Sequence, residues 1–297
     1  MSTASVDRTL AHAVFFGEAA RALYEKNAGG HIVGVFSHAL YAAFGGELLS
    51  FYDAEYGEVP FGVAVYGILD FLAAAASAGG AVEVGAAVSF APGEVRIGGR
   101  CLRLLPMQPP PRVHTPLAAP DALRLERVGD YVAANGSPRG ILELIGTNRG
   151  GAADSTAALA AAFRRGNAAA AVASAVRLLG LGRGLTPSGD DYLCGFFSTL
   201  LAARHAGLLL PMQPDAVMNA VCDAVPQRTS PISGAYLAAA CAGKYCTVYA
   251  AACAACLGVG SFQPFAAVAL KMGASSGTDT LCGALTAARV VGHASGK

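Results

Sequence analysis

The stretch PMQPPPRVHTPLAAPD, residues 106–121, divides this chain of 297 residues into two parts of different character. Proline has no amide hydrogen and a fixed φ, so a segment this rich in proline cannot continue a helix or a central strand. We therefore predict two domains, one over residues 1–110 and the other over residues 111–297.

The N-terminal side carries short apolar runs with β-branched and aromatic residues, which predict strands. Glycine or acidic turns separate them, and the residues from 67 to 80 predict one helix that ends at paired glycines. The runs are HIVGVFSHALYAAF (31–44), GELLSFYD (46–53), PFGVAVYG (60–67) and AVEVGAAVSFAPGEVRIGGRCLRLL (81–105). The C-terminal side consists of long alanine-rich helical segments. The predicted fold is therefore α+β, with a small β-rich N-terminal domain followed by a larger, mainly helical domain.

The composition limits the classes of function. The chain is 54% hydrophobic and only 14% charged, so it can bury a large core and is not disordered. Its formal net charge of +1 gives no electrostatic reason to bind nucleic acid or a membrane surface. No run reaches the roughly 18 apolar residues of a membrane span, and the N-terminus is a poor signal peptide, so we expect a cytoplasmic protein. Scarce charge also favours an oligomer, formed by self-association or with other subunits.

Two features have plain structural interpretations. Cys253 and Cys256 form a CxxC pair, but no second CxxC or histidine pair accompanies them, so we predict small core residues rather than a zinc site. His38 lies in an apolar stretch, which favours a histidine in the core or at a strand edge.

The stretch GLGRGLTPSGDDYLCG, residues 180–195, holds the densest set of candidate functional residues. Helical sequence precedes it, whereas a dinucleotide fold has its glycines directly after a strand, and it lacks the Gly-Lys-Ser/Thr end of a Walker A loop. We predict a helix, a glycine loop and a second helix. Ser188 and Asp191 have the spacing of a capping box, which by itself explains these two residues. It leaves Arg183, the glycines and Asp190 unexplained.

The functional hypothesis for this loop is an anion site. Several glycines let backbone amides converge, and a helix N-terminus with an arginine favours negative charge. The carboxylates need another task, such as accepting from an amide NH₂, pairing with an arginine or holding Mg²⁺. Mg²⁺ is the one cofactor kept open, and no residue is assigned as a metal ligand. The catalytic candidates are Asp190 and Asp191, and the binding candidates are Gly182, Arg183, Gly184, Thr186, Ser188, Gly189, Arg228, Thr229, Ser276, Gly277 and Asp279.

Part of this element occurs twice. SGDDYLCG (188–195) and SGTDTLCG (276–283) agree at six of eight positions, and Asp191 matches Asp279. Either two helices share a type of cap, or two helix starts face one site. Asp190 has no acidic counterpart, because Thr278 stands there, so it is the better catalytic candidate and Asp191 the more architectural one. The Arg228–Thr229 pair belongs either to the anion site or to an ordinary loop.

Three motifs together resemble a family known as a subunit of oxamate carbamoyltransferase, from anaerobic allantoin degradation. They are GLGRGLTPSGDDYLCG, RTSPISGAYLAAACAGKY and MGASSGTDTLCG, and the likeness extends over residues 168–290. The resemblance implies a role in converting oxalurate and phosphate to oxamate and carbamoyl phosphate, beside two larger subunits. The Ser-Thr-Arg-Thr phosphate loop of ordinary transcarbamylases is missing from the sequence, so their mechanism does not transfer.

Two alternatives to this function remain. One is a Mg²⁺-dependent phosphoryl-transfer or hydrolytic enzyme with its aspartates on the metal. The other is a non-catalytic structural subunit whose motif only caps and packs helices.

Overall fold

The structure, a computed structural model, describes residues 11–36, 38–77, 82–105 and 115–295. The chain forms two compact units, Met1–Arg112 and Val113–Lys297. Most of the predicted proline-rich connector, residues 106–114, lies outside the described residues. Among the helices that the structure describes, none is long and apolar enough to cross a membrane.

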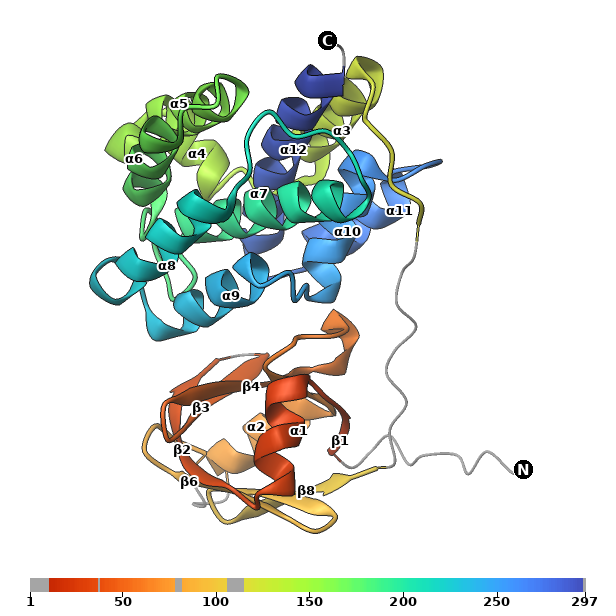
Figure 1. Cartoon of the computed structure of the whole chain (residues 1–297). Helices are drawn as coiled ribbons and strands as arrows, with labels where there is room; N and C mark the ends of the chain where they lie inside the picture. The colour runs from red at the N-terminus through yellow and green to blue at the C-terminus, as the bar shows by residue number, and fades with distance from the viewer. Residues whose placement is uncertain (1–10, 37, 78–81, 106–114, 296–297) are drawn as a thin grey trace. The chain divides into compact units, whose positions relative to one another are not determined.

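The first unit is a closed barrel of eight strands in the order β1-β5-β4-β3-β2-β6-β7-β8 (Figure 1). Two helices, α1 (Glu18–Glu25) and α2 (Ile68–Ser77), and the short 3₁₀ turn η1 (Ala54–Tyr56) accompany it. The strands are β1 (His12–Phe16), β2 (Gly29–Val35), β3 (Ala39–Phe44), β4 (Glu47–Asp53), β5 (Gly62–Tyr66), β6 (Ala87–Ala91), β7 (Glu94–Ile97) and β8 (Arg100–Leu104). Each predicted β-rich run contains one or more of these strands.

Closure of the barrel corrects the prediction of a simple small β-rich domain, although the chain remains α+β. Strand β1 pairs in parallel with β8, with His12 opposite Arg103, and thereby joins the first and last strands. Strands β4 and β5 also pair in parallel, which hairpin signals do not predict. The β1–β8 pairing joins segments that are distant in sequence, so local patterns could not reveal it, and it leaves the barrel without an open edge. Inside the barrel, Phe90 stacks on Phe44 and Phe51 at 5.5 and 6.4 Å between ring centroids.

His38 is exposed between β2 and β3, where its ring meets the Tyr56 ring edge to face at 6.1 Å. It therefore lies in the turn between these strands, and neither in the core nor within a strand.

The second unit is helical, as predicted for this part of the chain. Its helices are α3 (Ala122–Asn135), α4 (Ile141–Gly146), α5 (Ala152–Arg164), α6 (Ala168–Leu178), α7 (Ser188–His205), α8 (Asp215–Arg228), α9 (Pro231–Cys241), α10 (Thr247–Leu257), α11 (Gln263–Leu270) and α12 (Ser276–Ser295), with a 3₁₀ turn η2 at Arg149–Gly151. Helix α7 is the centre of this unit, because every residue from Ser188 to Ala203 is buried. Cys253 and Cys256 are buried on α10 as small core residues.

Helices α7 and α12 cross in direct backbone contact (Figure 1). A Cβ atom added to Gly195 of α7 would lie 1.9 Å from the carbonyl oxygen of Thr280 on α12. A Cβ atom added to Gly283 of α12 would likewise lie 1.9 Å from the carbonyl oxygen of Tyr192 on α7. The last glycine of each repeated motif therefore packs against the partner helix at the equivalent position, which relates the two helices by an approximate twofold axis.

We predict that Gly195→Ala lowers the free energy of unfolding by about 3 kcal/mol or more, because the added methyl group meets backbone that cannot move aside alone. The matched control is Gly146→Ala in α4, where an added Cβ atom has nothing within 4 Å. That control should leave stability unchanged or raise it by up to about 1 kcal/mol. Denaturant unfolding measures both, and equal stabilities would contradict the backbone contact.

Candidate functional site

The structure brings the two repeated helix starts together. Helix α7 begins at Ser188, its N-cap residue is Pro187, and no side chain caps it. The predicted capping box of Ser188 and Asp191 is therefore wrong. Ser188 is already inside the helix, so its hydroxyl is free to reach across the helix crossing.

Each serine of the motif pairs with the aspartate of the other copy. The Ser188 hydroxyl donates to the Asp279 carboxyl group, and the Ser276 hydroxyl donates to the Asp191 carboxyl group. These reciprocal contacts follow from the approximate twofold relation between α7 and α12. Of the two interpretations of the repeat, the geometry favours helix starts that face each other.

Asp279 also holds the start of α4. Its Oδ1 accepts from the Ile141 amide at 2.7 Å, and its Oδ2 accepts from the Ser275 hydroxyl at 3.1 Å. Gly140 has a φ of +74°, and a Cβ atom there would lie 2.5 Å from Oδ1 of Asp279. Burial raises the pKa of Asp279 to about 6, against the lowering effect of these hydrogen bonds.

Asp190 holds the glycine loop against the turn between α8 and α9. Its Oδ1 accepts from the Gly180 amide at 2.6 Å, and its Oδ2 accepts from the Ser233 hydroxyl at 2.6 Å and from the Thr229 hydroxyl. Burial raises its pKa, and the three hydrogen bonds oppose that rise. Both oxygens of this carboxyl group are occupied by the chain itself.

Asp191 is different, because it is fully buried and one of its oxygens has no partner. Its neighbours are the hydroxyls of Ser276 and Thr186, but among the described residues Oδ2 accepts no hydrogen bond. Burial, with Asp279 and Asp190 close by, raises its pKa well above the usual value. Folding therefore favours the protonated form of the Asp191 carboxyl group more strongly than water does.

The middle of the glycine loop is exposed to solvent. Gly182, Arg183 and Gly184 are exposed, whereas the Thr186 hydroxyl lies 3.2 Å from the Ser276 hydroxyl. The first amides of α7 are already used: that of Gly189 donates to the Leu181 carbonyl at 2.8 Å. The amides of Asp190 and Asp191 donate to the Pro187 carbonyl at 2.9 and 3.1 Å. An anion at this loop would consequently meet Arg183 and the exposed backbone rather than the first turn of the helix.

The remaining binding candidates have packing contacts. A Cβ atom at Gly189 would lie 1.9 Å from the Leu178 carbonyl oxygen, and one at Gly277 would lie 2.1 Å from that of Ala269. The Arg228 carbonyl lies against Gly180, while the Arg228 side chain is exposed. The structure thus gathers all the candidates into one region, with two of the glycines serving close helix contacts.

Mg²⁺ does not suit this cluster. In the part of the chain that the structure describes, no group of three or more His, Cys, Asp or Glu residues is placed to hold a metal ion. Both oxygens of Asp190 already accept hydrogen bonds, and Asp191 is buried among hydroxyls.

Sequence reasoning missed three partners of these aspartates. Ile141 and Ser275 bind Asp279, and Ser233 binds Asp190. Ser230 caps α9 by accepting from the Ser233 amide at 3.0 Å, while the Ser233 hydroxyl binds Asp190. Proline at the next position was a usable signal for Ser230, because proline is favoured at the first helical residue.

We predict that Asp190→Asn lowers the free energy of unfolding by about 1–3 kcal/mol, because the amide NH₂ cannot accept from the donors that surround it. Trypsin should then cleave faster after Arg183, because the loop loses its anchor. The control Asp215→Asn removes an exposed ion pair with Arg204 and should cost less than about 1 kcal/mol. Unchanged stability and cleavage in Asp190→Asn would refute the anchoring role.

We predict a pH dependence that comes from Asp279. Its pKa rises from 3.8 to about 6 on folding, so its stabilising contribution is complete below pH 3.8 and is lost as the pH rises through about 6. The stability of the wild type relative to Asp279→Asn should therefore fall by on the order of 2–3 kcal/mol between pH 4 and 7. Denaturant unfolding of both proteins across this range measures it, and a constant difference would exclude the shift.

The comparisons with known proteins concern the same region. The search of curated proteins found no match, and neither did the search of solved structures. Residues 178–288 match the model of a protein family described as "Oxamate carbamoyltransferase subunit AllH". The matched segment contains the glycine loop, the turn that carries Thr229 and Ser233, and both crossed helix starts. This part of the chain is therefore similar to the oxamate carbamoyltransferase subunit AllH.

Proposed function

We propose that this chain is a subunit of a carbamoyltransferase that acts on oxamate and carbamoyl phosphate. The observation that carries the proposal is the family match over residues 178–288, which includes every candidate site residue. In the phosphorolytic direction, the substrates are oxalurate and phosphate.

The chemistry of this reaction requires an anion site and a proton. A phosphate oxygen forms a bond to the carbamoyl carbon of oxalurate, and the bond from that carbon to the oxamate nitrogen breaks. The electron pair of the broken bond stays on nitrogen, which takes a proton to give the amide of oxamate. Phosphate and oxamate are both anions, so positive charge and a proton donor must lie together.

The exposed loop is the proposed place for the phosphate. Arg183 extends from it, and among the described residues its guanidinium makes no ion pair or hydrogen bond. A Cβ atom added to Gly184 would have nothing within 4 Å, so the backbone there is open to a ligand, whereas Gly182 packs against the Ser188 amide. Thr186 borders the same site, and we propose the exposed side chain of Arg228, next to the Thr229 that binds Asp190, as its outer wall.

Asp191 is the proposed proton source. Burial raises its pKa and so favours the protonated form, and its contact with the Thr186 hydroxyl gives a route from the buried carboxyl group to the loop. Asp190 is proposed as a positioning residue, because it fixes Gly180 and the turn with Thr229. Ser188, Gly189, Ser276, Gly277 and Asp279 then form the framework that holds Asp191 in place.

Other subunits are part of the proposal. The description of the family as a subunit, together with the low content of charged residues, supports assembly with other chains or with further copies of this chain. One observation favours a purely structural subunit instead, namely that Asp190 and Asp279 are fully engaged by the chain. Binding measurements decide between these two functions.

We predict that Arg183→Ala weakens the binding of phosphate and carbamoyl phosphate about tenfold or more, since an arginine–phosphate contact contributes roughly 1.5–3 kcal/mol. The control is Arg177→Ala, an exposed arginine on α6, which should bind as the wild type does. Calorimetric titration of the purified chain, alone and with its partner subunits, gives the affinities. Equal affinity in Arg183→Ala would leave the structural subunit as the better function.

We also predict that Asp191→Asn cuts turnover of the assembled enzyme by about a hundredfold or more, because the amide cannot serve as a general acid. Its melting temperature should stay close to that of the wild type, since asparagine has nearly the shape of aspartate and brings no charge into this buried position. Full activity in this variant would remove Asp191 from the mechanism, whereas a large loss of stability would show that its role is architectural.

A further inference from the structure

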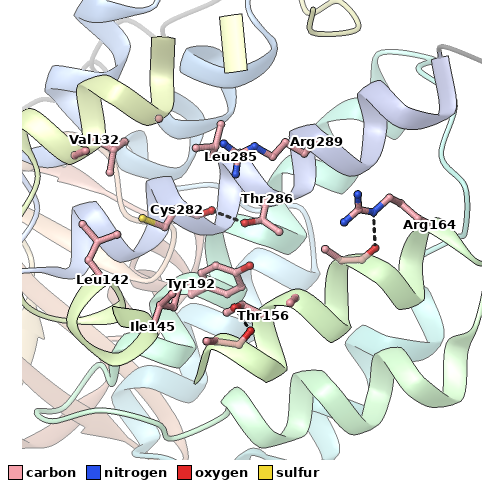
Figure 2. A pocket seen from close by; sticks show the side chains of 15 residues that line it. Val132, Leu142, Ile145, Thr156, Arg164, Tyr192, Cys282, Leu285, Thr286 and Arg289 are labelled. Carbon is pink, nitrogen blue, oxygen red and sulfur yellow. Dashed lines mark hydrogen bonds between the residues drawn. The ribbon is translucent and has the colours of Figure 1, made fainter. Parts of the chain in front are cut away.

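A pocket of about 440 Å³ lies beside the crossing of α7 and α12. Helices α3, α4 and α5 complete its walls, and Figure 2 shows the side chains that line it. The walls are mainly apolar, with Val132, Leu142, Ile145 and Leu285 as the larger members. This volume lies within the range of about 300–1,000 Å³ that is typical of small-molecule sites.

The pocket carries positive charge from two of its walls. Arg164 comes from α5 and Arg289 from α12, and the described lining contains no aspartate or glutamate. Among the described residues, the Arg289 guanidinium makes no hydrogen bond or ion pair. Arg164 uses only its Nε, which donates to the Ala160 carbonyl at 3.3 Å. A guanidinium has five N–H donors, so most donors of both arginines are available to an anion.

A buried hydroxyl lies in the same pocket. Tyr192 is 1% exposed, and among the described residues its hydroxyl makes no hydrogen bond of ordinary geometry. Its neighbour is the Thr286 hydroxyl, which donates to the Cys282 carbonyl at 3.0 Å, as Figure 2 shows, and keeps lone pairs that can face Tyr192. An acceptor atom of a ligand in the pocket would give the Tyr192 hydroxyl a hydrogen bond of ordinary geometry.

We infer that this pocket binds a small organic anion with an apolar body. The carboxylate or phosphate group lies between Arg164 and Arg289, and the apolar body packs against Val132, Leu142 and Leu285. The Tyr192 hydroxyl donates to a second acceptor atom of the ligand. This site stands apart from the proposed carbamoyl-transfer site, because no residue of the loop from 180 to 187 lines it.

The test is calorimetric titration of the full chain with hexyl phosphate, hexanoate and hexan-1-ol, at constant ionic strength. Both anions should bind, and hexan-1-ol should bind at least tenfold more weakly, because it lacks the charge that the arginines recognise. The tighter of the two anions identifies the head group as phosphate or carboxylate. Inorganic phosphate should fail to displace either one, because it has no apolar body, even where it binds at Arg183.

Variants then locate the binding site. Arg289→Gln and Arg164→Gln should each weaken the binding of the anions tenfold or more, whereas Arg177→Gln on α6 should leave it unchanged. Tyr192→Phe should weaken binding while the protein keeps its fold, which a circular dichroism spectrum and a melting curve confirm. The inference is overturned if neither anion binds, or if a chain with both Arg164→Gln and Arg289→Gln binds them as the wild type does.

Discussion

The backbone contact between α7 and α12 is the constraint on which the helical unit depends. Gly195 and Gly283 let the carbonyl groups of Thr280 and Tyr192 approach the partner helix more closely than any side chain would permit. Since the two glycines occupy equivalent places in the repeated motif, the helices cross about an approximate twofold axis. The crossing brings their first turns together, and the exchange of contacts between Ser188 and Asp279, and between Ser276 and Asp191, follows from it.

That arrangement buries three carboxyl groups within a short distance of one another, which is costly unless each is neutral or hydrogen-bonded. The three carboxyl groups are stabilised in different ways. Asp190 and Asp279 accept hydrogen bonds from backbone amides and hydroxyls, which tie the glycine loop and the start of α4 to the crossing. Asp191 has hydroxyl neighbours but, among the described residues, no backbone donor, and burial raises its pKa well above the usual value, which favours the protonated form.

Asp190 and Asp191 are adjacent but have different partners, and this difference bears on function. Because Asp190 anchors both ends of the loop, the residues between Gly182 and Leu185 are free to face solvent, and Arg183 lies among them. Anchoring and ligand binding are thus separate tasks of one short segment. The pocket with Arg164 and Arg289 uses the next turns of the same helices, beginning with Tyr192, one residue beyond Asp191.

The sequence by itself determined the division into a β-rich and a helical part and the positions of most strands and helices. Those features depend on local periodicity, on glycine and proline, and on short motifs, all of which are visible within a few residues. Only the tertiary structure decided that the barrel closes through β1 and β8, that Ser188 binds Asp279 instead of capping its own helix, and that Asp190 and Asp191 have different partners. Each of these is a pairing between residues far apart along the chain. The free energy of such a pairing depends on where the partner lies and on how deeply the pair is buried. No local sequence pattern encodes either of these.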